Sequence, residues 1–175
     1  MTPSEFNARI LLPCAAAFPF HDSPQSRTLL LTIAGQESFW ADRFQESEGP
    51  ARGFWQFESG TAASRGGVTG LVMHPVSAPI LKQFCLDWEL EFSIAAIYGA
   101  IAWCDPLAYA CARLLLWLDP APLPITGNKD SSYEYYLRNW RPGKPRPETW
   151  PARYAAATTV TTASAPAAPP STPAA

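Results

Sequence analysis

Histidine is scarce in this sequence, and charge of neither sign dominates it. The two histidines, His21 and His74, are isolated from each other and from the 4 cysteines, which include no Cys-x-x-Cys pair. The 13 basic residues are nearly balanced by 15 acidic ones, so the net charge is only -2. We therefore expect no metal site, no cofactor and no nucleic-acid partner, and we expect the cysteines to be free, buried thiols.

A secretory signal is also lacking, because the N-terminus has neither a basic start nor a small-residue cleavage site. The longest apolar run, residues 94–118, is long enough for a membrane span of roughly 20 residues. An Asp-Pro pair at 105–106 interrupts it, however, and Arg113 lies within it. The run therefore predicts two core helices and no membrane span. Arg113 has Tyr109 and Trp117 at helical spacing on either side, so its guanidinium is expected to stack on their rings.

Helix-start signals predict a mainly α-helical fold. The segment Thr2-Pro3-Ser4-Glu5 combines an N-cap residue, a proline at the first helical position and a glutamate three residues after the cap. It predicts a helix through about Ala17, and Ser23-Pro24 predicts a second helix that continues to residue 37 or 38. Further helices are expected over residues 60–64, 75–86, 87–103 and 106–118, after Ser131, and from Glu148 to about Ala156.

Composition predicts one domain followed by a tail. The chain has 175 residues, of which 47% are hydrophobic, and it is long enough to bury a core. We expect this domain to span residues 1–155, with no strand pattern beyond a small hairpin around residues 54–57. Residues 156–175 are rich in Ala, Thr and Pro, so we expect them to form a disordered tail.

Glu37 is a carboxylate at a helix position that usually carries an apolar residue. It follows Ala34 and Ile33 by three and four residues and Leu30 by seven, which places it on the core-facing side of the helix. Burial without a cationic partner raises a carboxyl pKa, so Glu37 is a candidate general acid near neutral pH. In the alternative interpretation, Glu37 merely ends the helix and turns into solvent.

Three short segments around this acid carry a family resemblance. Glu37-Ser38 is followed by Gly53-Phe54-Trp55-Gln56 and then by Thr61-Ala62. This combination resembles the goose-type lysozyme and soluble lytic transglycosylase family, in which a Glu-Ser pair ends one helix and a Gly-Leu-Met-Gln segment lies across the cleft. Further along, Ala96-Ile97-Tyr98-Gly99 is similar to the family's Ala-Tyr-Asn motif, with glycine in place of asparagine.

The resemblance implies both a fold and an activity. The fold would be a lysozyme-like helical domain with a substrate cleft between the Glu37 helix and the loop around Gln56. The activity would be cleavage of the β-1,4 glycosidic bond between N-acetylmuramic acid and N-acetylglucosamine in peptidoglycan. Glu37 would act as acid and base of a lytic transglycosylase, since one acid suffices for that reaction. A hydrolytic muramidase would need a second carboxylate, for which Glu58 and Glu48 are the candidates.

Several other residues are expected to contact the glycan strand. The indole of Trp55 and the amide of Gln56 suit sugar stacking and N-acetyl recognition, and Ser38 would help to hold the sugar. Tyr98 is either part of the cleft floor or an ordinary core tyrosine. Tyr136 offers a flat face of the type that stacks on sugars, as do the nearby Tyr133 and Trp140.

The lack of a signal peptide and the basic, proline-rich segment 141–147 favour a bacteriophage protein that degrades cell walls. Such a protein would be located in the virion, or in the host cytoplasm before its release to the periplasm and cell wall. Its partners would be peptidoglycan glycan strands and other virion proteins. Two alternatives stay open: a non-catalytic virion structural or ejection protein with a lysozyme-like fold, and a carbohydrate-binding module. For the cations of segment 141–147, contact with acidic groups of the wall and a solvated loop are the two interpretations.

Overall fold

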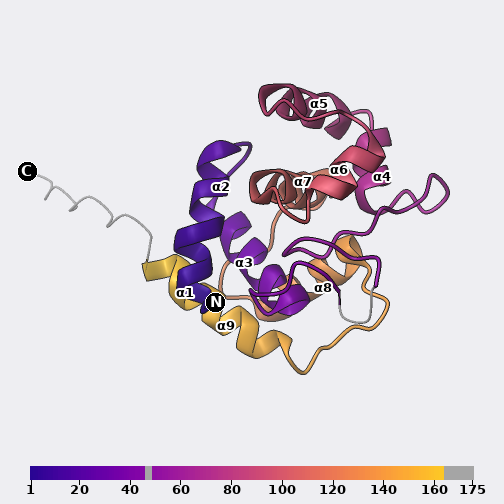
Figure 1. Cartoon of the computed structure of the whole chain (residues 1–175). Coiled ribbons are helices and arrows are strands. Elements are labelled where there is room, and N and C mark those ends of the chain that lie inside the picture. The colour runs from indigo at the N-terminus through magenta and orange to yellow at the C-terminus, as the bar shows by residue number, and fades with distance from the viewer. Residues whose placement is uncertain (46–48, 164–175) are drawn as a thin grey trace, which may run out of the picture.

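Helices form nearly all of the regular structure in this computed structural model, which describes residues 1–45 and 49–163 (Figure 1). The helices are α1 (Pro3–Phe6), a π-helical segment (Asn7–Leu11), α2 (Leu12–Ala17), α3 (Pro24–Ser38), α4 (Gly67–Met73), α5 (Ser77–Asp87), α6 (Ile94–Ala100), α7 (Asp105–Leu118), α8 (Lys129–Trp140) and α9 (Trp150–Ala163). Within the described residues, β pairing is limited to the isolated bridges Phe44–Arg52 and Arg52–Phe57. The prediction of a mainly α fold is therefore confirmed.

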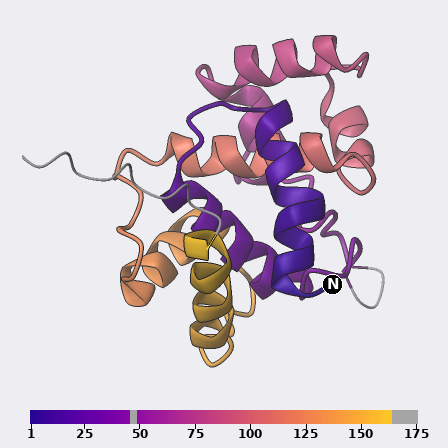
Figure 2. The same ribbon diagram turned by 90° about the vertical axis from the view of Figure 1, so that its left-hand side faces the viewer.

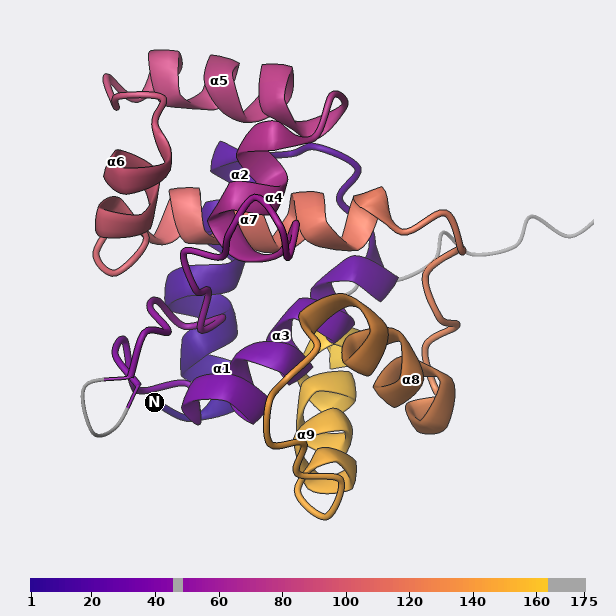
Figure 3. The same cartoon turned by 90° about the vertical axis from the view of Figure 1, so that its right-hand side faces the viewer.

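Helix α7 lies at the centre of the molecule. It is buried along most of its length, from residue 107 to 114 and at Leu116, and most of these residues are small or aliphatic. In Figure 3, α5 lies on one side of α7, while α3, α8 and α9 lie on the other. Helix α2 packs against α7, and α1 reaches the pair formed by α3 and α9 (Figure 2). The core is thus shared by both halves of the chain.

The N-terminal helical segment, from α1 to α2, begins at the residue that the sequence predicts. The Thr2 side chain accepts a hydrogen bond from the N–H of Glu5, and the Glu5 carboxylate accepts one from the N–H of Thr2 at 2.7 Å. Pro13 is the second residue of α2 and directly follows the π-helical segment, where the N–H of Leu12 bonds to the carbonyl of Asn7. The wider π turn accommodates the proline ring, which lacks an N–H and clashes with the preceding turn of a regular helix.

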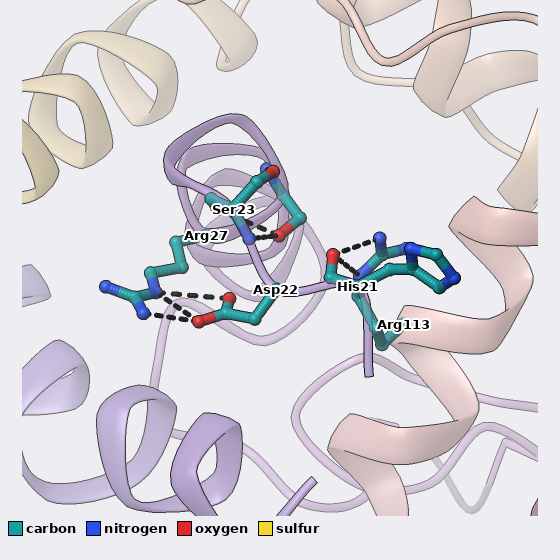
Figure 4. Close-up of polar contacts among 6 residues, drawn as sticks. His21, Asp22, Ser23, Arg27 and Arg113 are labelled. Carbon is teal, nitrogen blue, oxygen red and sulfur yellow. Dashed lines mark hydrogen bonds and ion pairs between the residues drawn. The ribbon is translucent and has the colours of Figure 1, made fainter. Parts of the chain in front are cut away.

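The start of α3 is fixed by a polar cluster (Figure 4). Ser23 and Ser26 cap each other's backbone N–H groups, and the Arg27 Nε donates to the Asp22 carboxylate at 2.8 Å. The buried Arg113 guanidinium donates to the carbonyl of His21 through Nε at 3.1 Å. The expected stacking of Arg113 on aromatic rings is therefore wrong, because its guanidinium closes the turn before α3 instead.

Helix α9 extends further than predicted. It packs along α3 more extensively than any other pair of described elements, and it buries Ala157 completely. The hydroxyls of Thr161 and Thr28 lie 2.7 Å apart across this contact. Residues 156–163 are thus helical, which corrects the expected domain boundary at 155. The expected disorder of residues 164–175 lies outside the described part of the chain.

Two other helix predictions are corrected by backbone geometry. Residues 60–64 form a turn, and α4 begins only at Gly67, where φ is +60° and a Cβ would lie 2.2 Å from the Glu58 carbonyl oxygen. The helix expected from residue 87 begins at Ile94, because Glu89 has a φ of +53° and Ser93 provides the N-cap. The apolar spacing before residue 94 belongs to a loop whose side chains also reach the core.

Within residues 1–45 and 49–163, no single helix is long and apolar enough to cross a membrane. Helices α6 and α7 pass that test by length and composition when taken together, but the pair is bent by 116° at the break. The four cysteines are free, and Cys14, Cys85 and Cys111 are buried.

Candidate functional site

A groove of about 1720 Å³ opens beside the C-terminal end of α3. It is lined by Glu37 and the loop that follows it, by residues 56–58, and by the turn 64–67 with part of α4. Further walls are formed by the end of α7 with residues 119–121, and by the stretch from Arg138 to Lys144 together with Arg146. The groove therefore brings the acid singled out by the sequence together with the loop that follows it and with the basic segment after α8.

Glu37 is a half-buried acid that lines this groove. Its Oε1 accepts a hydrogen bond from the Tyr136 hydroxyl at 2.6 Å. Burial raises the pKa of the Glu37 carboxyl above its ordinary value of 4.5, and this effect outweighs the hydrogen bond from Tyr136 and the positive charge of Arg146, which both lower the pKa. A carboxyl in this state holds its proton to higher pH than a free glutamic acid, as a general acid must.

The end of α3 is held in a strained conformation that fixes the direction of Glu37. Phe39 and Trp40 have φ values of +53° and +56°, which residues other than glycine rarely adopt. The Trp40 indole folds back over Gly35, where a Cβ would lie 2.3 Å from the ring, and its Nε1 donates to the Leu31 carbonyl at 2.9 Å. This fold-back ends the helix abruptly just after Glu37.

Strained backbone is concentrated around the groove. Among the described residues, seven other than glycine have positive φ, and four of them line the groove: Phe39, Gln56, Arg65 and Arg141. Such conformations cost free energy and persist where surrounding contacts enforce them, which is typical of functional sites. The clustering supports the groove as the functional site independently of any motif.

Of the two residues predicted to contact sugar on the loop opposite Glu37, one lines the groove and the other is buried. Gln56 lines the groove, and its Nε2 donates to the Gly53 carbonyl at 2.9 Å. Trp55 is completely buried, and its Nε1 donates to the Leu30 carbonyl at 3.0 Å. Its predicted contact with a sugar is therefore wrong, because the indole anchors the loop to the back of α3. The predicted hairpin is reduced to a turn closed by the Arg52–Phe57 bridge.

Ser38 and Tyr98 are structural residues rather than groove residues. Ser38 is 1% exposed, and its hydroxyl donates to the Ala34 carbonyl at 2.8 Å within α3. The Tyr98 hydroxyl donates to the carbonyl of Pro50, and the Arg52 guanidinium lies 4.2 Å from the centre of its ring. Both predicted substrate contacts are corrected, because one side chain caps its own helix and the other fastens the loop before Gly53.

Tyr136 reaches the site in a different role from the predicted one. Its ring is 2% exposed and stacks on Trp150 with the centroids 5.0 Å apart, so its face is not available to a sugar. Its hydroxyl instead holds Glu37. Trp140, one of the aromatic neighbours expected to offer a flat face, does line the groove, and its Nε1 donates to the Trp55 carbonyl at 3.0 Å.

Gln36, which the sequence did not single out, joins α3 to the segment before α9. Its buried side chain donates to the Arg146 carbonyl at 3.0 Å and accepts from the Thr149 hydroxyl at 2.9 Å. The Arg146 Nη2 returns a bond to the Gln36 carbonyl at 2.6 Å. These partners are more than one hundred residues apart, so no local signal identifies the pairing, although a glutamine inside an apolar helix marks a buried polar contact.

Of the two candidate second carboxylates, only Glu58 lies in the described part of the chain. Glu58 lines the groove and is exposed, whereas Glu48 lies outside the described part of the chain. Asp42 and Asp119 also line the groove and were not predicted. Asp119 is engaged by Arg138, whose Nε donates to its Oδ2 at 2.7 Å. Exposed acids in the groove are therefore limited to Asp42 and Glu58 among residues 1–45 and 49–163.

Comparisons of the chain with protein-family models, with curated proteins and with solved structures each found no match. Residues 1–45 and 49–163 contain no group of three or more His, Cys, Asp or Glu side chains placed to hold a metal ion.

Proposed function

We propose that this protein cleaves the β-1,4 glycosidic bond between N-acetylmuramic acid and N-acetylglucosamine in peptidoglycan, with Glu37 as acid and base. The observation that carries the proposal is the state of Glu37: a carboxyl with a raised pKa, held by Tyr136, in a groove of about 1720 Å³. A groove of this size accommodates several sugar units of an extended strand. The proposed fold type is lysozyme-like, in keeping with the helical architecture and with the Glu-Ser and Gly-Phe-Trp-Gln segments.

The proposed reaction is a lytic transglycosylation. Protonated Glu37 donates its proton to the glycosidic oxygen, which leaves as the 4-hydroxyl of N-acetylglucosamine. The Glu37 carboxylate then takes the proton of the muramic acid C6 hydroxyl while that oxygen bonds to C1. The sugar product carries a 1,6-anhydro ring, and Glu37 is protonated again at the end. The Tyr136 hydrogen bond stabilises the carboxylate formed between the two proton transfers.

A hydrolytic muramidase is the second candidate, and Glu58 is the observation that favours it. Inverting hydrolysis requires a second carboxylate about 6.5–9.5 Å from the acid, with room for a water molecule between them. Glu58 lines the groove together with Glu37, as does Asp42. We rank this reaction second because both acids are exposed and no hydrogen bond to either side chain fixes it in the described structure.

The biological setting we propose is a bacteriophage, in which the protein degrades the cell wall from the virion or after synthesis in the host. A virion component without turnover would share the fold but would not need a half-buried acid with a raised pKa in a groove. Zymography on gels that contain purified cell walls tests the proposal. We expect a cleared band for the native protein and none for Glu37→Gln. No clearing by the folded native protein would overturn the enzymatic proposal and favour a structural or carbohydrate-binding role.

A further inference from the structure

Three exposed cations line the same groove as Glu37: Arg65, Arg141 and Lys144, which we call the basic rim. None of the three forms an ion pair or lies over an aromatic ring within the described part of the chain. Their charges therefore have no ion-pair or aromatic partner in residues 1–45 and 49–163.

The other two arginines that line the groove are already engaged. Arg138 donates to the Asp119 carboxylate at 2.7 Å. Arg146 donates to the Gln36 carbonyl at 2.6 Å, and its guanidinium lies 5.1 Å from the centre of the Phe39 ring. Arg138 and Arg146 thus hold the walls of the groove together, whereas the basic rim is available to a ligand.

The backbone at two members of the basic rim is unusual for arginine. Arg141 has φ and ψ of +48° and +52° at the C-cap of α8, and Arg65 has a φ of +49°. Glycine or asparagine normally occupies such positions, because a Cβ clashes with the neighbouring carbonyl. The N–H of Arg141 bonds to the Leu137 carbonyl at 3.0 Å, a contact that glycine would make equally well. The strain therefore points to a role for the side chain itself.

We propose that the basic rim binds carboxylate groups of the glycan strand while the bond to be cleaved lies at Glu37. This inference rests on the proposed function. A strand carries carboxylates from two sources: the lactyl group of a muramic acid without a peptide, and the side chains and end of an attached stem peptide. A guanidinium matches a carboxylate with two parallel hydrogen bonds, and the Lys144 ammonium adds a point charge.

The size of the expected effect follows from the exposure of the basic rim. Exposed ion pairs contribute little individually, and salt screens them over about 10 Å at 0.1 M ionic strength. Neutralising Arg141 and Lys144 together should therefore weaken binding about 3- to 10-fold at low salt. The loss should shrink at high salt, and a strand without carboxylates should show none.

Binding is best measured in a Glu37→Gln background, so that strands are not cleaved during the titration. Three fluorescent ligands are compared: a neutral N-acetylglucosamine oligomer, a peptide-free glycan strand with lactyl carboxylates, and a strand that retains its stem peptides. The test variant adds Arg141→Gln and Lys144→Gln. The matched control adds Arg9→Gln and Lys82→Gln, which remove the same two types of exposed charge outside the groove. A further variant with Arg141→Gly in place of Arg141→Gln removes the backbone strain together with the charge.

The proposal predicts weaker binding of the charged strands only, in both rim variants and not in the control. Weaker binding of the peptide-free strand identifies the lactyl carboxylate as the group that the rim binds. Weaker binding of the stem-bearing strand alone identifies the carboxylates of the stem peptide. Equal losses on the neutral oligomer, unchanged affinities, or no binding of any ligand would each overturn the proposal. Wall cleavage by protein with Glu37 intact is assayed in parallel. If walls are cleaved but the rim substitutions leave binding unchanged, only the proposal about the basic rim is rejected. If the rim substitutions weaken binding but walls are not cleaved, only the enzymatic proposal is rejected.

Discussion

The two ends of α3 differ in nearly every physical respect. At its start, Ser23 and Ser26 cap each other, and Arg27 pairs with Asp22 across one turn. These contacts satisfy the free backbone groups of the first turn and stabilise the helix. None of these residues lines the groove.

The end of α3 is built against the usual preferences. Two successive residues, Phe39 and Trp40, adopt left-handed backbone conformations, and the half-buried Glu37 carboxyl, whose pKa is raised, lies two residues before Phe39. Each of these features costs free energy and is held in place by distant parts of the chain, among them Tyr136. The comparison indicates that stabilising contacts are concentrated at one end of the helix, and that the unfavourable features lie at the other end, where we propose the chemistry.

The largest expected effect is at the strained end. Glu37→Gln keeps the size of the side chain and an oxygen that accepts from Tyr136, but it removes the proton donor. We expect activity on purified walls to fall by at least about 100-fold. Glu134→Gln, an exposed change on α8 outside the groove lining, is the matched control and should leave activity unchanged. Near-native turnover by Glu37→Gln would exclude Glu37 as the acid.

The same substitution should alter how stability depends on pH. Because burial raises the pKa of Glu37 in the folded protein above 4.5, the folded state binds this proton more tightly than the unfolded state. The free energy of unfolding contributed by this group therefore falls as pH rises from 4.5 through the folded pKa. In Glu37→Gln this decrease in the free energy of unfolding should be absent. Chemical denaturation at several pH values measures it. Parallel stability profiles for the two proteins would mean that Glu37 is not effectively buried.

The next largest effect should come from Tyr136→Phe. The variant keeps the ring that stacks on Trp150 but removes the hydrogen bond to the Glu37 carboxylate. A lost bond to a charged group should reduce activity about tenfold. The carboxylate is destabilised, so the pKa of Glu37 rises and the alkaline limb of the kcat/KM profile should move to higher pH. An unmoved limb would show that Tyr136 serves packing alone, and Tyr135→Phe provides a control on the same helix.

Ser23→Ala tests the opposite end of the helix. Loss of this N-cap should lower the free energy of unfolding by about 1 kcal/mol, while activity at a temperature where the protein stays folded should not change. Thermal unfolding and wall-clearing rates measured on the same preparation check both statements. A large loss of activity in the folded variant would show that the two ends of α3 are not separable.

A smaller effect is expected from shortening the chain. Ending it at Ala157 removes the Thr161 hydroxyl that meets Thr28 on α3, and should lower stability by about 0.5–1 kcal/mol. Ending it at Ala163 retains this contact and should leave both stability and activity unchanged. Equal stability of the two shortened proteins would show that the last turns of α9 add nothing to α3.

Sequence signals predicted those features whose causes are local. The caps at Thr2 and Ser23 are confirmed, because the side chain and the backbone groups it satisfies lie within three residues. The placement of Glu37 follows from helical periodicity among apolar neighbours. Helix α4 was missed because its first residue, Gly67, looks like a helix stop. In the structure glycine is needed there because φ is +60° and a Cβ would clash with the Glu58 carbonyl.

The features that prediction missed depend on distant contacts. A tryptophan beside glycines has the same local pattern whether it faces a groove or the core, and only the Leu30 carbonyl and surrounding rings show that Trp55 is buried. The partner of Glu37 lies 99 residues away along the chain, so the role of Tyr136 could not be inferred from spacing. Likewise, Gln36 is explained only by its bonds to Arg146.

The most direct test of the central claim is mass spectrometry of the muropeptides released from purified walls. If Glu37 serves as the single acid and base, the native protein should release fragments that end in 1,6-anhydromuramic acid, and Glu37→Gln should release none. Fragments with reducing muramic acid ends, which are heavier by one water, would contradict the transglycosylase account and direct attention to Glu58 as the base of a hydrolase. The absence of any released fragment would contradict cleavage altogether.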